Sequence, residues 1–228
     1  LSVLHDCDTP SLFELLKVVK PVFVADESHK IYTSLSQEFF KTNSVASFIL
    51  ELTATPKEYD SSHRPNIIFN ASGAELISNG LIKKTIKYNS TVGQDTTALL
   101  AEVVGLRNKI AEKAQAAGQT LQPKVLVSVE YTGRKRAGER HSVDEITNIL
   151  NELGVAEEQI VIKSSERDQL GERDLDDPLE PAQFVLTKTA LVEGWDCKSV
   201  YIIVLLNNIG ARLTNAQIVG RGLRQPRQ

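Results

Sequence analysis

Residues 21–30, PVFVADESHK, are an apolar run that passes directly into two acids, a serine and a histidine. The run from Val22 to Ala25 has the length and composition of a short buried strand. In open α/β sheets ligands gather at the carboxyl ends of the strands, and Asp26 and Glu27 stand at such an end. There one carboxylate can hold a magnesium ion while its neighbour orients or deprotonates an attacking water. The alternative interpretation is an acidic pair in an ordinary solvated loop.

Short apolar runs alternate with longer amphipathic stretches along the whole chain, a pattern that predicts an α/β fold with mainly parallel sheets and covering helices. The predicted strands are residues 22–25, 47–52, 66–69, 85–88, 124–130, 159–163, 183–187 and 200–205. An apolar stripe over residues 99–110 predicts a helix that Gly118 closes. A second stripe predicts a helix that begins at the capping pair Ser142 and Glu145 and ends at Gly154.

Two polar segments interrupt this pattern. Residues 88–97, YNSTVGQDTT, predict a domain boundary close before or within them. The acidic residues 165–181 are most simply an exposed loop.

Composition limits the classes of protein to which the chain can belong. Its 228 residues, 41% of them hydrophobic, are enough for one large or two modest domains. A net charge of −3 gives no sign that the protein as a whole binds polyanions. Any surface that binds nucleic acid must therefore be a local cluster of positive charge. Cys7 and Cys197 are too few for a disulfide framework or a zinc site, which fits a reducing compartment.

The ends of the sequence carry further expectations. The start, LSVLHDCDTP, has charges where a signal peptide would be apolar, and no apolar run approaches the roughly 20 residues of a membrane span. We therefore expect a cytoplasmic protein with no membrane partner. Because the sequence has no methionine, we expect it to be a piece of a longer polypeptide.

A second motif, FILELTATPK at residues 48–57, is a strand that runs into Thr53, Ala54 and Thr55 before Pro56 ends it. The two hydroxyls can link the acidic pair to a neighbouring surface through hydrogen bonds. The alternative is a simple turn at the end of a strand. Together the two motifs place acids and hydroxyls at one edge of the sheet, from adjacent strands.

A third motif spans residues 184–204, FVLTKTALVEGWDCKSVYIIV. It is organised as a strand, a short helical turn, the sequence Gly194-Trp195-Asp196 and a second strand.

A fourth motif, NAQIVGRGLRQP at residues 215–226, predicts a helix that begins at Thr214. Arg221 and Arg224 are three residues apart and therefore project from one helix face. Residues 211–228 contain four arginines and no acid, a bias that suits an anionic partner. The alternative is a solvated helix face, but the glycines beside Arg221 cost helix stability and indicate close approach to another element.

These four motifs, in this order and at plausible spacing, resemble motifs II, III, V and VI of superfamily 2 helicases of the DExH type. The matching residues are Asp26-Glu27-Ser28-His29, Thr53-Ala54-Thr55-Pro56, Glu193-Gly194-Trp195-Asp196 and Gln217, Gly220, Arg221 and Arg224. Within them, TKTALVEGWDC and QIVGRGLRQP are most similar to the restriction subunit of type III restriction enzymes and related bacterial helicase-like proteins.

The resemblance implies two RecA-like lobes of the P-loop NTPase fold. The first lobe, residues 1–82, would be incomplete and would carry motifs II and III, and the second, residues 83–228, would carry motifs V and VI. ATP and Mg²⁺ would bind in the cleft between the lobes, and DNA would lie across both.

The resemblance also implies roles for individual residues. Asp26 would hold magnesium and Glu27 would activate water, while His29, Thr53 and Thr55 would couple the nucleotide state to lobe movement.

The second lobe would supply the remaining contacts. Nucleotide contacts would come from Gly194, Asp196 and Gln217, and contacts to the γ-phosphate from Arg221 and Arg224. Candidates for the DNA backbone are, by charge alone, Lys188, Arg134, Lys135 and Arg136. For the last three a solvated basic loop is an equal alternative.

One departure from the family pattern is the absence of a G-x-x-x-x-G-K-[ST] phosphate loop from the 228 residues. We expect such a loop before Leu1 and any nuclease domain after Gln228. A DNA methyltransferase subunit is the expected protein partner of a type III system. The alternative function is a helicase-like platform that binds DNA or docks proteins without hydrolysing ATP.

Overall fold

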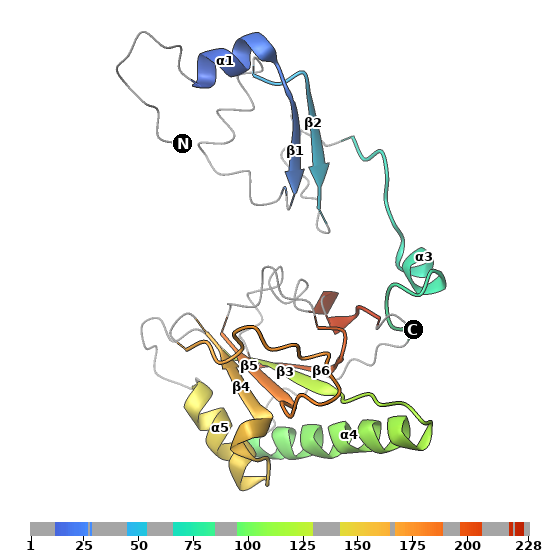
Figure 1. Cartoon of the computed structure of the whole chain (residues 1–228), viewed down its shortest axis with the longest axis vertical. Helices are drawn as coiled ribbons and strands as arrows, with labels where there is room; N and C mark the ends of the chain where they lie inside the picture. Colours follow the sequence, from blue (N-terminus) through green and yellow to red (C-terminus); the bar gives the residue numbers. More distant parts are fainter. Residues whose placement is uncertain are drawn as a thin grey trace. The chain divides into compact units, whose positions relative to one another are not determined.

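The structure, a computed structural model, describes residues 12–26, 28, 45–53, 66–84, 95–129, 142–164, 167–188, 197–206, 219–220 and 222–225. The chain divides into two compact units, residues 1–70 and residues 71–228 (Figure 1). The division lies earlier than the predicted lobe boundary between residues 82 and 83, and the assignment of the units as RecA-like lobes stays a prediction.

The first unit contains helix α1 (Leu12–Val19) and two strands, β1 (Val22–Asp26) and β2 (Phe48–Leu52). The strands are parallel, and their register runs from the pair Val22 and Phe48 to the pair Asp26 and Leu52 (Figure 1). Both strands are rich in β-branched, aromatic and leucine residues, which favour a pleated, partly buried surface.

One face of this two-stranded sheet is apolar and exposed. Val22, Val24 and Phe48 are 60%, 63% and 55% exposed, and they share a face because alternate residues and register partners point the same way. Among the residues that the structure describes, none covers this face.

The second unit is built on a four-stranded sheet in the order β4-β5-β3-β6, in which every neighbouring pair is parallel. The strands are β3 (Lys124–Ser128), β4 (Ile160–Lys163), β5 (Phe184–Thr187) and β6 (Val200–Leu205). A 3-10 turn, η2 (Glu157–Gln159), precedes β4. Every residue of β3 and β5 is buried, as expected for central parallel strands covered on both sides.

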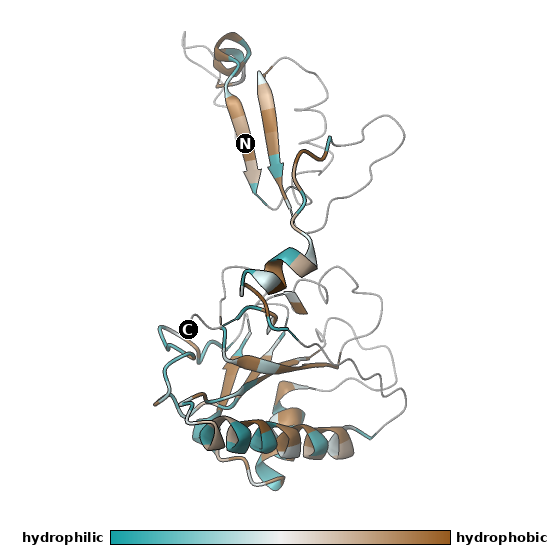
Figure 2. Ribbon diagram, turned by 90° about the vertical axis from the view of Figure 1, so that its right-hand side faces the viewer, coloured by the Kyte–Doolittle hydropathy of each residue, from teal (hydrophilic) through white to brown (hydrophobic). Residues whose placement is uncertain are grey.

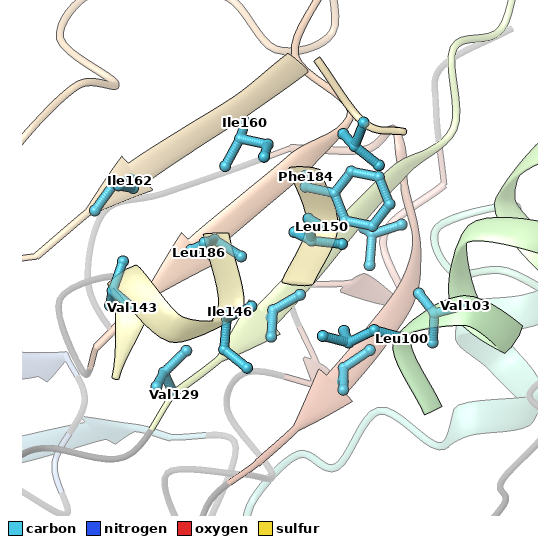
Figure 3. Close-up of a cluster of buried hydrophobic side chains, with 14 residues drawn as sticks. Leu100, Val103, Val129, Val143, Ile146, Leu150, Ile160, Ile162, Phe184 and Leu186 are labelled. Carbon is cyan, nitrogen blue, oxygen red and sulfur yellow. The ribbon is translucent and has the colours of Figure 1, made fainter. Parts of the chain in front are cut away.

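Helices α4 (Thr96–Ala116) and α5 (Val143–Glu152) contact each other and cover one face of this sheet. Leu100 and Val103 of α4 join Ile146 and Leu150 of α5 against Phe184 of β5 in one apolar core (Figure 3). Figure 2 shows hydrophobic residues concentrated on the strands of this unit and both kinds of residue along α4, as an amphipathic covering helix requires.

The acidic segment 167–182 covers the opposite face. Leu170, Leu175 and Ala182 are buried there in a second core with strand residues that include Leu126 and Val185. The expectation of an exposed loop is therefore confirmed only in part: most of its charged residues are exposed, but Asp176 and Glu180 are half-buried, and Leu170 and Leu175 pack against the sheet.

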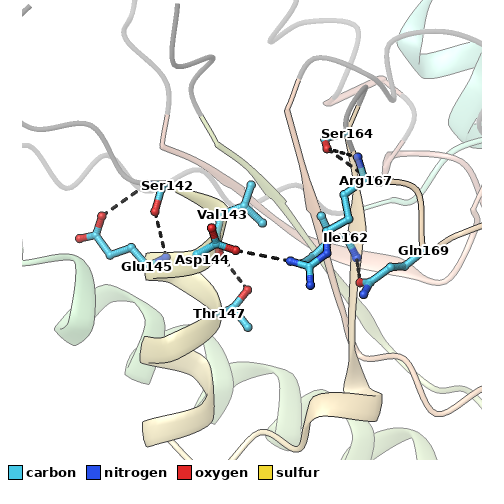
Figure 4. A network of polar contacts seen from close by, with 9 residues as sticks. All are labelled: Ser142, Val143, Asp144, Glu145, Thr147, Ile162, Ser164, Arg167 and Gln169. Carbon is cyan, nitrogen blue, oxygen red and sulfur yellow. Dashed lines mark hydrogen bonds and ion pairs between the residues drawn. The ribbon is translucent and has the colours of Figure 1, made fainter. Parts of the chain in front are cut away.

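The predicted helix ends are confirmed in the second unit. The Ser142 hydroxyl accepts a hydrogen bond from Glu145 N–H (3.0 Å), and the Glu145 carboxylate accepts one from Ser142 N–H (3.3 Å) (Figure 4). Gly118 and Gly154, which follow α4 and α5, have φ angles of +71° and +86°, a conformation that glycine adopts without strain. Asp95 caps the start of α4 through Ala98 N–H (3.1 Å).

One predicted strand is wrong. Residues 66–69 have no regular secondary structure, and Ile67 and Phe69 are 61% and 82% exposed. A short apolar run becomes a strand only when a neighbouring strand pairs with it. The predicted strand at 85–88 lies outside the described residues. Helix α3 (Gly73–Ser78), which begins at a capping box of Ser72 and Glu75, was not expected.

Within the described part of the chain, no helix has both the length and the apolar character needed to cross a membrane.

Candidate functional site

Asp26 and Thr53 lie at the same edge of the first sheet. Asp26 is the last residue of β1, is exposed, and pairs in register with Leu52, so Thr53 is the first residue beyond β2 at that edge. The parallel register thus brings together two strand ends that are 27 positions apart in sequence. Glu27, His29 and Thr55, the other predicted site residues of this region, lie outside the described residues.

An exposed carboxylate at a strand end is a fitting magnesium ligand. Mg²⁺ keeps several waters and binds proteins through one or two carboxylates together with substrate phosphates. No group of three or more His, Cys, Asp or Glu side chains that could hold a metal occurs in the part of the chain that the structure describes.

The carboxyl edge of the second sheet is formed by buried hydroxyl residues. Ser128 and Thr187 are register partners at the ends of β3 and β5, and each is 1% exposed. Pairing continues one residue further, because Val129 N–H donates to the Thr187 carbonyl (2.8 Å). Lys188, half-buried, follows at once, so this predicted DNA contact begins at the edge of the sheet where ligands bind in α/β folds. Gly194 and Asp196 lie outside the described residues.

Arg224 is exposed and belongs to a short antiparallel pairing with residues 81–83. Its backbone bridges to Ile82, Lys83 N–H donates to the Leu223 carbonyl (2.7 Å), and Gln225 N–H donates to the Leu81 carbonyl (3.0 Å). Gln217 and Arg221 lie outside the described residues, as do Arg134, Lys135 and Arg136.

Lys83 is a residue of this region that no motif in the sequence points to. Its ammonium group donates to the carbonyls of Lys198 (3.0 Å), Gly222 (2.8 Å) and Arg224 (2.6 Å). It also lies 4.7 Å from the centre of the Tyr201 ring. Burial lowers the pKa of Lys83 to about 8, against the opposing effect of Cys197 and Asp176. Lys83 and Lys84 are adjacent lysines in a polar stretch, and such a sequence does not indicate that one of them makes these contacts.

Asp176 fixes the turn that leads into β6. Its carboxylate accepts hydrogen bonds from Lys198 N–H (3.1 Å) and Ser199 N–H (2.8 Å). Burial raises the pKa of Asp176, but these bonds favour the ionised form and lower it overall. Burial raises the pKa of the neighbouring Cys197 to about 12, so this thiol stays neutral. The turn follows directly after the predicted nucleotide contacts Gly194 and Asp196.

Two further cations are structural. Lys124 is 1% exposed, and its ammonium donates to the Glu180 carbonyl (2.9 Å). The guanidinium of Arg107 in α4 donates to the Pro123 carbonyl (3.2 Å). Burial lowers the pKa of both groups. Because these charges are turned into the protein, neither contributes to a nucleic-acid surface.

Comparisons with known proteins add a general likeness of fold. No family profile matches the sequence. No curated protein matches it. Two solved structures are similar: S. cerevisiae Dbp5 bound to RNA and ADP BeF3, and a single-substitution variant of that protein with the same ligands.

Each of the two matches has a TM-score of 0.40 and 13% identity, and covers 91% of this chain and 54% of the other. The chain thus spans about half the length of the structures that it matches. The predicted α/β class with parallel sheets is confirmed by the strand pairings of both units. At this score and identity the likeness concerns the fold alone and says nothing about function.

Proposed function

We propose that the chain is part of an ATP-driven nucleic-acid motor. The observation that carries the proposal is the edge formed by Asp26 and Thr53. An acid and a hydroxyl, taken from two motifs that resemble helicase motifs II and III, end adjacent parallel strands in register. Hydrolysis of a phosphoanhydride needs a metal-binding carboxylate and a group that orients water a few ångströms apart.

The proposed roles follow from the resemblance of the four motifs to those of superfamily 2 helicases. Asp26 would hold the Mg²⁺ of a bound ATP, which shields the charge of the phosphates, and Glu27 would polarise the attacking water. Arg221 and Arg224 would stabilise the negative charge that develops on the γ-phosphate, and this charge is greater in the transition state than in the ground state. His29, Thr53 and Thr55 would transmit the nucleotide state, and Gly194, Asp196 and Gln217 would contact the nucleotide.

The proposed substrate track is duplex DNA, and the proposed protein is the restriction subunit of a type III restriction-modification system in the cytoplasm. The support for this finer proposal is the similarity of TKTALVEGWDC and QIVGRGLRQP to that subunit. Lys188, which follows β5, is the described DNA-backbone candidate. A methyltransferase subunit would be the partner.

The alternative is a platform that binds DNA or docks proteins without turnover. A sequence upstream of Leu1 that lacks a phosphate loop would favour it. The presence of both acids and both arginines favours the motor, because a platform needs neither pair.

Steady-state ATP hydrolysis by the complete polypeptide, measured with duplex DNA, single-stranded DNA and single-stranded RNA, tests the proposal. A DNA motor is expected to hydrolyse ATP faster with duplex DNA than with no nucleic acid. Stimulation by RNA alone would contradict the DNA track. Tight DNA binding with no turnover would support the platform.

A further inference from the structure

The ammonium group of Lys83 joins two backbone segments that are far apart in sequence. One is the turn before β6, through the Lys198 carbonyl at 3.0 Å. The other is the segment that carries the predicted motif VI, through the carbonyls of Gly222 at 2.8 Å and Arg224 at 2.6 Å. An ammonium group has three N–H donors, and each of these carbonyls can accept one.

The segment around Gly222 lies directly on β6. A Cβ added to Gly222 would come within 2.4 Å of Ile203 Cδ1 and 3.4 Å of Val200 Cγ1. The sequence predicted close approach beside Arg221, and at Gly222 the element that approaches is β6. A larger residue at this position would force either the Ile203 side chain or the segment itself to shift.

The lysine is held by its surroundings as well as by its hydrogen bonds. Lys83 N–H donates to the Leu223 carbonyl (2.7 Å), so backbone and side chain of one residue bind three consecutive residues, 222–224. The Tyr201 ring, 4.7 Å from Nζ, lies beneath the ammonium group and adds a cation–π attraction. Asp176 fixes the other side of the same turn through Lys198 N–H (3.1 Å).

We propose that Lys83 is a positioning residue that holds the Gly222–Arg224 segment against β6 and thereby fixes Arg224 for the nucleotide. The contacts to the three carbonyls do not depend on the proposed function, whereas the role for Arg224 rests on it. Arg224 is exposed, and its backbone carbonyl accepts one of the hydrogen bonds of Lys83. An arginine that acts on a transferring phosphate loses effect when it is displaced by about 1 Å.

Hydrogen exchange in the 228-residue chain tests the contacts without any nucleotide. Lys83→Met keeps the length of the side chain and removes all three donors, and Lys84→Met is the matched control at the exposed neighbouring position. We expect the amides of Lys83 and Gln225 to exchange at least about tenfold faster in Lys83→Met and to be unchanged in Lys84→Met. Unchanged exchange at these amides would overturn the proposal.

A second variant guards against a general loss of folding. If amides in β3 also exchange faster in Lys83→Met, Gly222→Ala is the second variant, because its Cβ crowds Ile203 where the segment meets β6 and Lys83 is unchanged. The same local rise in exchange at Gln225 is then expected. No local rise in Gly222→Ala would count against the contact with β6.

A double-mutant cycle on ATP turnover by the complete protein tests the role for Arg224. If Lys83 acts through Arg224, Lys83→Met lowers kcat at least about tenfold but lowers it little further when Arg224→Lys is already present. The positioning role would be overturned if the double variant lost kcat by the product of the two single losses, or if kcat were unchanged in Lys83→Met. A wild-type protein without turnover would refute the proposed function and the role of Arg224, whereas the exchange data would still decide the contacts.

Discussion

Asp26 and Leu52 are register partners at the final position of two parallel strands. This pairing places Asp26, at the end of β1, and Thr53, the first residue beyond β2, at one common edge. In an open α/β sheet that edge is where ligands bind. The two motifs therefore belong to one place in the fold, although they are separated in sequence.

The isolated 228-residue chain is expected to hydrolyse ATP negligibly, even with magnesium and DNA. It contains Asp26 and Glu27 but no phosphate loop, which supplies the main contacts to the phosphates in such motors. A steady-state phosphate-release assay checks this expectation. Robust DNA-stimulated turnover by the isolated chain would show that the phosphates are held in another way.

Ser142→Ala is expected to destabilise the second unit by about 1 kcal/mol, because it removes the side-chain acceptor at the start of α5. Urea denaturation measures the change in the free energy of unfolding. Ser72→Ala is the matched control: it removes the same kind of cap from α3, which buries no residue. A smaller effect is expected there, since α3 can fray without opening the core. Equal losses of stability in the two variants would show that the burial of α5 does not increase the contribution of its cap.

Much of the second unit was predictable because its signals are local. The capping pair Ser142 and Glu145, and the glycines at 118 and 154, are read from neighbouring residues and were found as expected. The apolar strands are also local signals. Residues 66–69 show the limit of this approach, since whether an apolar run pairs depends on strands elsewhere in the chain.

The contacts around the site were less predictable for the same reason. Lys83 binds carbonyls at residues 198, 222 and 224, and Asp176 binds amides at 198 and 199. Backbone carbonyls and amides cannot be recognised in the sequence, so a lysine or an aspartate that binds them looks like any surface charge. Burial of the leucines in the acidic segment was not predicted, because acidic residues surround them in the sequence.

Asp176→Ala is expected to destabilise the second unit by about 1 to 3 kcal/mol, because it leaves the buried amides of Lys198 and Ser199 without their acceptor. Glu172→Ala, at an exposed position of the same segment, is the control. The pKa of Asp176 is lowered in the folded state, so its stabilising effect is present above the ordinary value of 3.8. The difference between wild type and variant is expected to shrink as pH falls below that value. A difference that stays constant down to pH 2 would contradict this assignment.

The pH dependence of stability is expected to carry the signature of Lys83. Its pKa is lowered to about 8 in the folded state, and the unfolded chain has the ordinary value of 10.5. Between these values the unfolded state binds more protons, so folding stability rises with pH. Wild type is therefore expected to gain stability relative to Lys83→Met from pH 7 to pH 10. Chemical denaturation of both proteins at several pH values measures this gain, and a flat or falling difference would show that the ammonium group is not buried.

ATP turnover by the complete protein with Glu27→Gln tests the motor most directly. The amide keeps the shape of the carboxylate but lacks the charge that polarises water, and loss of a general base costs about 10²- to 10⁴-fold in rate. We predict a fall of that size in DNA-stimulated turnover with nucleotide affinity largely retained, and no change in Glu172→Gln. Turnover equal to wild type in Glu27→Gln would contradict the account, because it would leave the acids at the end of β1 as an ordinary solvated loop.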